Sequence, residues 1–159
     1  MKQSNLSKWL KFITIAVGIM GAIVFFLIIP SEGRMIAKAN PEYSYCYWIW
    51  LSFIWVMAVP CYLVLVYFWK ICNQIERDNS FSLENAKSLT RISQLAIFDT
   101  IICFFGNVIL LLMGISHPGV IILFLFVIFA GVAVAVVSAA LSHLVEKAST
   151  IQEENNLTI

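Results

Sequence analysis

Four apolar stretches, each long enough to cross a lipid bilayer, take up most of this chain. They run over residues 10–29, 45–69, 95–115 and 120–144. A helix needs about 20 apolar residues to cross roughly 30 Å of hydrocarbon. Hydrophobic residues make up 61% of the chain and charged residues 12%, whereas a soluble domain is about half apolar and a quarter charged. The sequence therefore predicts one polytopic membrane domain over residues 1–159, an all-α four-helix transmembrane bundle.

The positions of Lys and Arg predict the orientation, because cytoplasmic segments of membrane proteins carry an excess of both. Eight of the ten lie in the N-terminal segment, in the loop 70–94 or in the tail 145–159, and the other two are Arg34 and Lys38. We therefore expect both termini, this loop and this tail in the cytoplasm. The formal net charge of +1 argues against direct binding of nucleic acid through a basic face.

Two of the predicted helices extend beyond their apolar stretches. Ser82 is a good N-cap, and Glu84 follows it in the first turn, where the helix dipole favours a carboxylate. The third helix is thus expected to begin beside Ser82, in the cytoplasm. Helical periodicity also continues past the fourth stretch and predicts a helix to about Gln152. Pro60 lies inside the second stretch and is expected to kink it.

Small residues recur at helical spacing on three of the predicted spans. Membrane helices pack closely through such residues, since lipid provides no hydrophobic driving force for their association. These stripes are therefore expected to face one another in a left-handed bundle. They contain Thr14, Gly18 and Gly21; Ser93, Ala96, Thr100, Cys103, Asn107 and Gly114; and Gly131, Ala135, Ser138 and Ser142.

Asp99 is the strongly ionisable residue inside a predicted span. A central Asp costs roughly 2.5–3.5 kcal/mol on insertion scales, and Asp99 is expected close to the cytoplasmic edge of its span, where water reaches it and the cost is smaller. It has two interpretations: a buried acceptor that sets helix register, or a proton or cation site or a switch. Arg91, two turns earlier, is a candidate partner through water or a neighbouring helix. Asn107 lies deeper and is expected to form a hydrogen bond across a helix interface.

Motifs for catalysis or metal binding are missing from the sequence. His143 and Glu146 form a two-residue pair without further ligands, and the four cysteines contain no Cys-x-x-Cys pair. Phosphate loops, nucleophile elbows and paired carboxylates are absent as well. The sequence therefore predicts a protein that is not an enzyme and that uses no cofactor or metal.

Two short stretches, 79–85 (NSFSLEN) and 154–159 (ENNLTI), together with the order of the spans, carry a family resemblance. The chain resembles an uncharacterised family of bacterial membrane proteins, catalogued as domain of unknown function twenty-nine seventy-five. The resemblance implies a location in the bacterial plasma membrane and supplies no activity and no catalytic residues. Members are often encoded beside a small helix-turn-helix regulator, which implies a transcription regulator as cytoplasmic partner.

The favoured hypothesis is therefore a regulatory or sensory membrane protein that docks a cytoplasmic partner. One alternative is a small transporter or channel-like oligomer with Asp99 and Asn107 along its path. Another is a structural assembly partner in the membrane. The candidate docking residues share the predicted cytoplasmic side and are Phe81, Ser82, Glu84, Asn85, Leu157, Thr158 and Ile159.

Overall fold

The computed structural model describes residues 3–116 and 118–157, and these residues form helices joined by short connections, without a β-strand. Four of the helices are long and apolar enough to cross a membrane, as the sequence predicts. The elements are α1 (Gln3–Ile23), η1 (Val24–Ile28), α2 (Ile29–Ala39), η2 (Pro41–Tyr43), α3 (Cys46–Glu76), α4 (Leu83–Leu112) and α5 (Pro118–Leu157).

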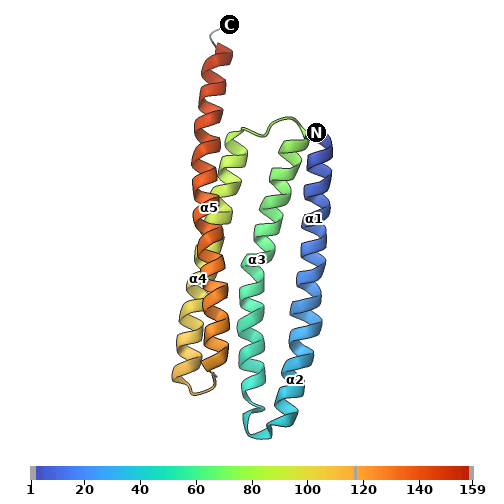
Figure 1. Ribbon diagram of the computed structural model, residues 1–159, viewed down its shortest axis with the longest axis vertical. Coiled ribbons are helices and arrows are strands. Elements are labelled where there is room, and N and C mark those ends of the chain that lie inside the picture. The colour runs from blue at the N-terminus through green and yellow to red at the C-terminus, as the bar shows by residue number, and fades with distance from the viewer. Residues whose placement is uncertain (1–2, 117, 158–159) are drawn as a thin grey trace.

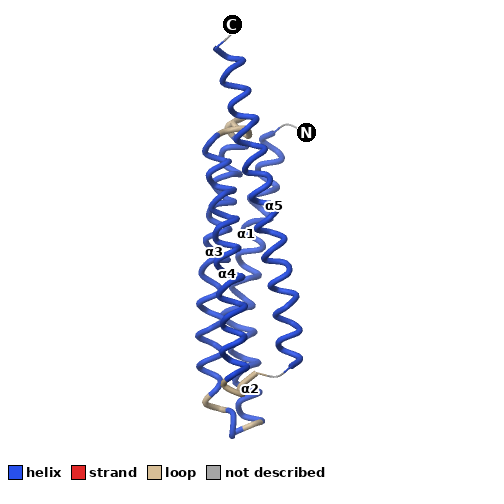
Figure 2. The backbone as a smooth tube through the Cα atoms, turned by 90° about the vertical axis from the view of Figure 1, so that its left-hand side faces the viewer, coloured by secondary structure: helices blue, strands red, loops and turns tan. Residues whose placement is uncertain are grey.

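The main contacts between the long helices follow the order of the chain, and in Figure 1 α1 lies on one side of α3 while the overlapping α4 and α5 lie on the other. α1 packs on α3, α3 packs on α4, and α4 packs on α5, which is the most extensive contact. A view from the side shows the helices running along a common axis (Figure 2). The expectation that the small-residue stripes of three spans all face one another is therefore wrong for the first helix. Gly18 and Gly21 of that helix face Leu65 and Tyr62 of α3.

The seam between α4 and α5 is built from small residues, as expected from their spacing. The Ser93 hydroxyl donates to the carbonyl oxygen of Ala135 at 2.8 Å, and the Ser142 hydroxyl donates to that of Ala86 at 2.7 Å. Both hydroxyls are buried and cross from one helix to the other. Side chains this small allow the two backbones to approach within reach of such bonds.

The first span is one continuous helical run from α1 through η1 to α2, with a π-helical segment in its middle. Within that segment the Ile29 N–H bonds to the carbonyl oxygen of Val24, five residues back. In the same register the next donor would be Pro30, which has no N–H. The Trp55 indole N–H instead donates to the Phe25 carbonyl oxygen at 3.2 Å. A side chain from α3 thus satisfies a backbone acceptor that the first helix leaves open.

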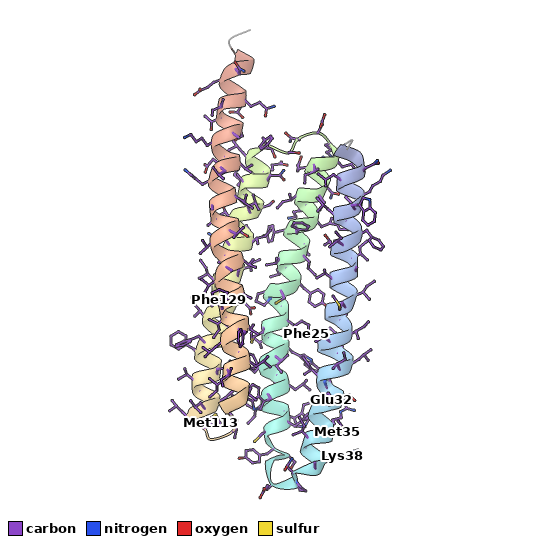
Figure 3. The ribbon with its side chains drawn as sticks, in the orientation of Figure 1. Phe25, Glu32, Met35, Lys38, Met113 and Phe129 are labelled. Carbon is purple, nitrogen blue, oxygen red and sulfur yellow. The ribbon has the colours of Figure 1, made fainter. Side chains whose placement is uncertain are left out.

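Large apolar side chains cover the outside of the molecule along its length. Phe129 on α5 is 74% exposed, and Met113 beyond the end of α4 is 57% exposed (Figure 3). Continuous exposed apolar surface of this extent is rare on soluble proteins. It is the surface expected of helices in contact with lipid.

Both ends of the chain lie at the same end of the molecule, and α5 projects beyond the other helices there (Figure 1). The 40 residues of α5 correspond to about 60 Å of helix. α5 continues to Leu157, so the predicted end near Gln152 is too early.

α3 is continuous through Pro60. Ser82 is the N-cap of α4 and accepts from the Asn85 N–H, which confirms the predicted helix start.

Candidate functional site

Asp99 lies near the middle of α4, about 24 Å along the axis from Leu83. One carboxylate oxygen, Oδ2, is 3.6 Å from the Cys61 thiol on α3, which donates to it. The other oxygen, Oδ1, is buried and has no hydrogen-bond partner among the described residues. The structure thus gives Asp99 one weak contact between helices and one free acceptor inside the molecule.

The other two residues predicted to act with Asp99 are engaged elsewhere. Arg91 is exposed and donates to the Gln94 side chain at 3.1 Å, about 12 Å along the helix from Asp99. The Asn107 amide donates to the Cys103 carbonyl oxygen of its own helix at 2.8 Å. The expected bond from Asn107 across a helix interface is therefore not formed among the described residues, and its Oδ1 is buried without a partner.

The connection between α3 and α4 is held by a cluster of amide side chains. The Asn85 amide donates to the carbonyl oxygens of Asn79 and Ser80 at 3.3 and 2.9 Å. Asn85 is only 2% exposed, so it holds the loop from inside. The Gln74 amide donates to the Glu84 carboxylate and accepts from Asn79, which ties the end of α3 to the start of α4.

Phe81 is the exposed aromatic residue of this connection. Its side chain is 58% exposed, and it directly precedes the N-cap Ser82. A hydrophobic staple would fold this ring onto the first turn of its own helix. The exposure instead leaves much of the ring free. Of the other candidate docking residues, Leu157 ends α5, its side chain lies outside the described part, and Thr158 and Ile159 lie outside the described residues.

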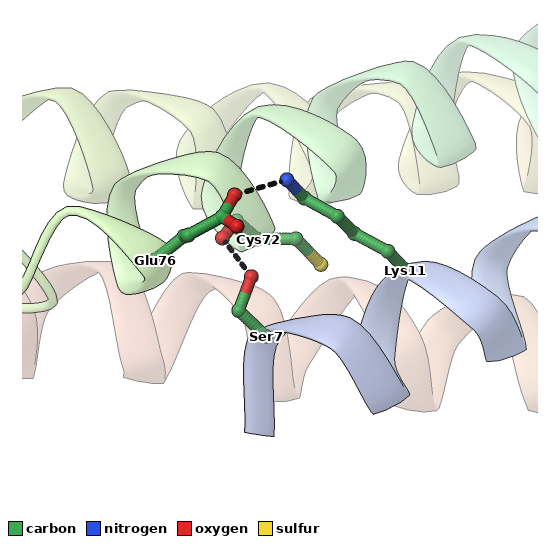
Figure 4. A network of polar contacts seen from close by, with 4 residues as sticks. All are labelled: Ser7, Lys11, Cys72 and Glu76. Carbon is green, nitrogen blue, oxygen red and sulfur yellow. Dashed lines mark hydrogen bonds and ion pairs between the residues drawn. The ribbon is translucent and has the colours of Figure 1, made fainter. Parts of the chain in front are cut away.

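A polar contact near the N-terminus joins the first helix to α3 at the same end of the molecule (Figure 4). The Lys11 ammonium is 2.5 Å from the Glu76 carboxylate, and the Ser7 hydroxyl donates to the Cys72 carbonyl oxygen at 2.7 Å. Sequence reasoning missed this pairing. The sequence shows only that Lys11 and Glu76 carry opposite charges at the predicted cytoplasmic ends of the first two spans. Other charged residues lie at the same ends, so the sequence does not identify which of them pair.

Residues 3–116 and 118–157 contain no group of three or more His, Cys, Asp or Glu side chains placed to hold a metal ion. All four cysteines are free thiols. The polar groups of the interior are single hydroxyls, amides and one carboxylate, which can bind a polar atom or fix a helix contact.

Long apolar helices with lipid-type outer surfaces define a polytopic α-helical membrane protein. Residues 33–159 match the family described as protein of unknown function (DUF2975), and the chain belongs to that family. It is also similar to the uncharacterized membrane protein YoaS of Bacillus subtilis (strain 168), at 28% identity over 153 residues. That match covers 95% of this chain and 96% of YoaS. No solved structure matches the chain.

Proposed function

We propose that this chain is a non-enzymatic regulatory membrane protein that docks a cytoplasmic partner at the end where its termini lie. The proposed docking face consists of Phe81, Glu84 and the projecting part of α5 from Thr150 to Asn155. The observation that carries the proposal is the projection of α5 past the start of α4 (Figure 1). The projecting turns of α5 extend past the neighbouring helices and offer a helical surface to another molecule (Figure 1).

The surface chemistry of this face supports a protein partner. Ile151, within the docking face, is 56% exposed, and Leu144, seven residues earlier on the same side of α5, is 61% exposed. Gln152 and Glu153 flank them with polar, exposed side chains. Apolar anchors at this spacing within a polar surface are how helices are recognised in grooves. Phe81 adds an exposed aromatic ring from the neighbouring loop, and aromatic residues are enriched among interface hot spots.

The distribution of charge supports the cytoplasmic side for this face. Lys8, Lys11, Lys70 and Arg77 belong to the end of the molecule that holds the termini, whereas Arg34 and Lys38 lie on α2 at the opposite end (Figure 1). The positive-inside rule then directs the docking face toward the cytoplasm. The partner expected from the family resemblance is a small helix-turn-helix regulator.

Capture of a small helix-turn-helix regulator, of the kind that the family resemblance implies, with the full chain in mild detergent tests the proposal. We expect Phe81→Ala to weaken capture at least tenfold, which corresponds to about 1.4 kcal/mol. Deletion of Glu154–Ile159 should also weaken capture and leave insertion unchanged. Phe129→Ala is the control, because it removes an even more exposed ring, 74% against 58% for Phe81, from the apolar part of α5.

Two outcomes would contradict the proposal. If the intact chain captures no regulator, the docking function loses its support. If Phe81→Ala and Phe129→Ala capture the regulator as well as the parent, Phe81 is not an anchor, and binding of its ring to lipid headgroups replaces that role. Equal capture by the intact and truncated chains would remove Glu154 and Asn155 from the face.

A further inference from the structure

A cleft of about 690 Å³ opens at the end of the molecule opposite the termini. Its floor is the first part of α3, one wall is α2, and the other wall is the α4–α5 turn with the start of α5. The cleft forms because α2 and the start of α5 lie on opposite sides of α3 (Figure 1). Its volume lies within the range of about 300–1,000 Å³ that is typical of small-molecule sites.

Contacts between each wall and the floor on α3 hold the two walls apart. A Cβ atom on Gly33 would lie 2.9 Å from the Tyr47 ring, so α2 already packs tightly on α3 at this point. The Tyr47 hydroxyl donates to the Pro30 carbonyl oxygen at 3.4 Å. On the other side, the Trp50 indole donates to the Ile115 carbonyl oxygen at 3.0 Å and ties the turn to the floor. The walls are thus fixed to the floor independently, without closing on each other.

The lining is mainly apolar. Glu32 lines the cleft from α2, is exposed, and forms no ion pair within the described chain. The cations of α2, Arg34 and Lys38, line a separate depression on the same helix. The cleft therefore combines an apolar interior with one negative charge.

We propose that this cleft binds a free single-chain amphiphilic amine. The apolar body would lie against Trp50, Ile54 and Phe124, and the ammonium group would pair with the Glu32 carboxylate. A carboxylate ligand is disfavoured, because Glu32 would repel it, and a neutral alcohol lacks the ion pair. The site does not depend on the docking face, which lies at the other end of the molecule.

The test uses the full chain in phosphatidylcholine nanodiscs and a photoreactive alkyl amine as probe. Empty nanodiscs correct for partition into lipid, and mass spectrometry locates the labelled residues. We expect label on residues 46–54 and 114–124. Dodecylamine should compete for this label at concentrations at least tenfold below those needed with dodecanol or dodecanoate.

Variants separate this cleft from general lipid exposure. Ala37→Phe places a ring in the cleft and should lower labelling at least tenfold, whereas Ala39→Phe, on the same helix and outside the lining, should not change it. Glu32→Gln alters an exposed side chain and should remove the preference for the amine over the alcohol. Uniform label along the outer helices, equal label in Ala37→Phe, or an unchanged amine preference in Glu32→Gln would overturn the proposal. Equal competition by phosphatidylethanolamine would assign the cleft to a membrane lipid and overturn the free amine.

Discussion

The Trp55 indole donates its N–H to the Phe25 carbonyl oxygen. In the i to i+5 spacing of the π-helical segment, the backbone donor for this oxygen would be Pro30, which has no N–H. An unsatisfied backbone acceptor at membrane depth is costly, because lipid supplies no donor. Trp55 therefore supports the π-helical segment between α1 and α2 from the neighbouring helix. The contact also fixes the position of α2, which forms one wall of the cleft.

Trp55→Phe is expected to destabilise the packing of the first helix on α3. Hydrogen bonds between membrane helices contribute about 0.6 kcal/mol on average and up to about 1.7 kcal/mol. We expect a loss in this range in the free energy of unfolding, measured by denaturant titration in detergent micelles. Trp48→Phe is the control, since Trp48 is 63% exposed. Equal losses in the two variants would show that the hydrogen bond contributes nothing specific.

Glycine substitutions should separate close helix contacts from open ones. A Cβ on Gly106 would lie 2.1 Å from the Phe53 ring, which also packs against the Trp50 and Phe124 rings and has little room to move. Gly106→Ala should therefore cost about 1–3 kcal/mol in the free energy of unfolding, as overpacked sites do.

Gly18→Ala provides the matched comparison. Its Cβ would meet only Leu65 at 3.7 Å, an ordinary contact, and Ala is the better helix former by about 1 kcal/mol. We expect this variant to be as stable as the parent or more stable in the same unfolding assay. If Gly106→Ala were tolerated as well as Gly18→Ala, the close approach of α3 and α4 would be incorrect.

The features predicted correctly from sequence depend on one helix or on neighbours in the chain. Apolar length identifies the four spans, and Ser82 identifies the start of α4 through its own capping chemistry. The stripe from Gly131 to Ser142 marks the α5 surface that packs on α4, because small residues permit that approach.

The features that sequence missed depend on which helices become neighbours. Thr14, Gly18 and Gly21 form a stripe like the others, and periodicity does not reveal that α3 is their neighbour. The use of the Asn107 amide within its own helix follows from the local position of Cys103, which competes with any partner on another helix. The cleft is formed by α2, α3 and the α4–α5 turn, so its lining is dispersed along the chain and has no signature as a motif.

The stability of Asp99 variants tests whether this residue sets the register of the helices. Asp99 accepts one weak hydrogen bond, from the Cys61 thiol at 3.6 Å, and its Oδ1 is buried without a partner among the described residues, so little stabilisation is lost when the carboxylate is removed. Asp99→Leu should be as stable as the parent or more stable in detergent, and Asp99→Asn should remain folded and inserted. A loss above about 1 kcal/mol in Asp99→Leu would support the register-setting role instead.

Flux measurements with the same variants test the transporter alternative. Purified chain in liposomes is expected to show no proton or cation flux above that of empty liposomes. If the parent conducts and Asp99→Asn abolishes the flux without loss of stability, a small transporter replaces the regulatory protein as the function.

The orientation in the membrane decides whether the docking face is available to a cytoplasmic partner. Four crossings bring the two ends of the chain to the same end of the molecule (Figure 1), and the excess of Lys and Arg there predicts the cytoplasm. Reporters fused after Ser4 and after Ile159 should both read as cytoplasmic. A reporter fused after Asn40, where α2 has ended, should read as external. If one of the reporters at Ser4 and Ile159 reads as cytoplasmic and the other as external, the chain does not cross the membrane four times. If both read as external, the docking face does not lie in the cytoplasm, although the packing of the helices is unchanged.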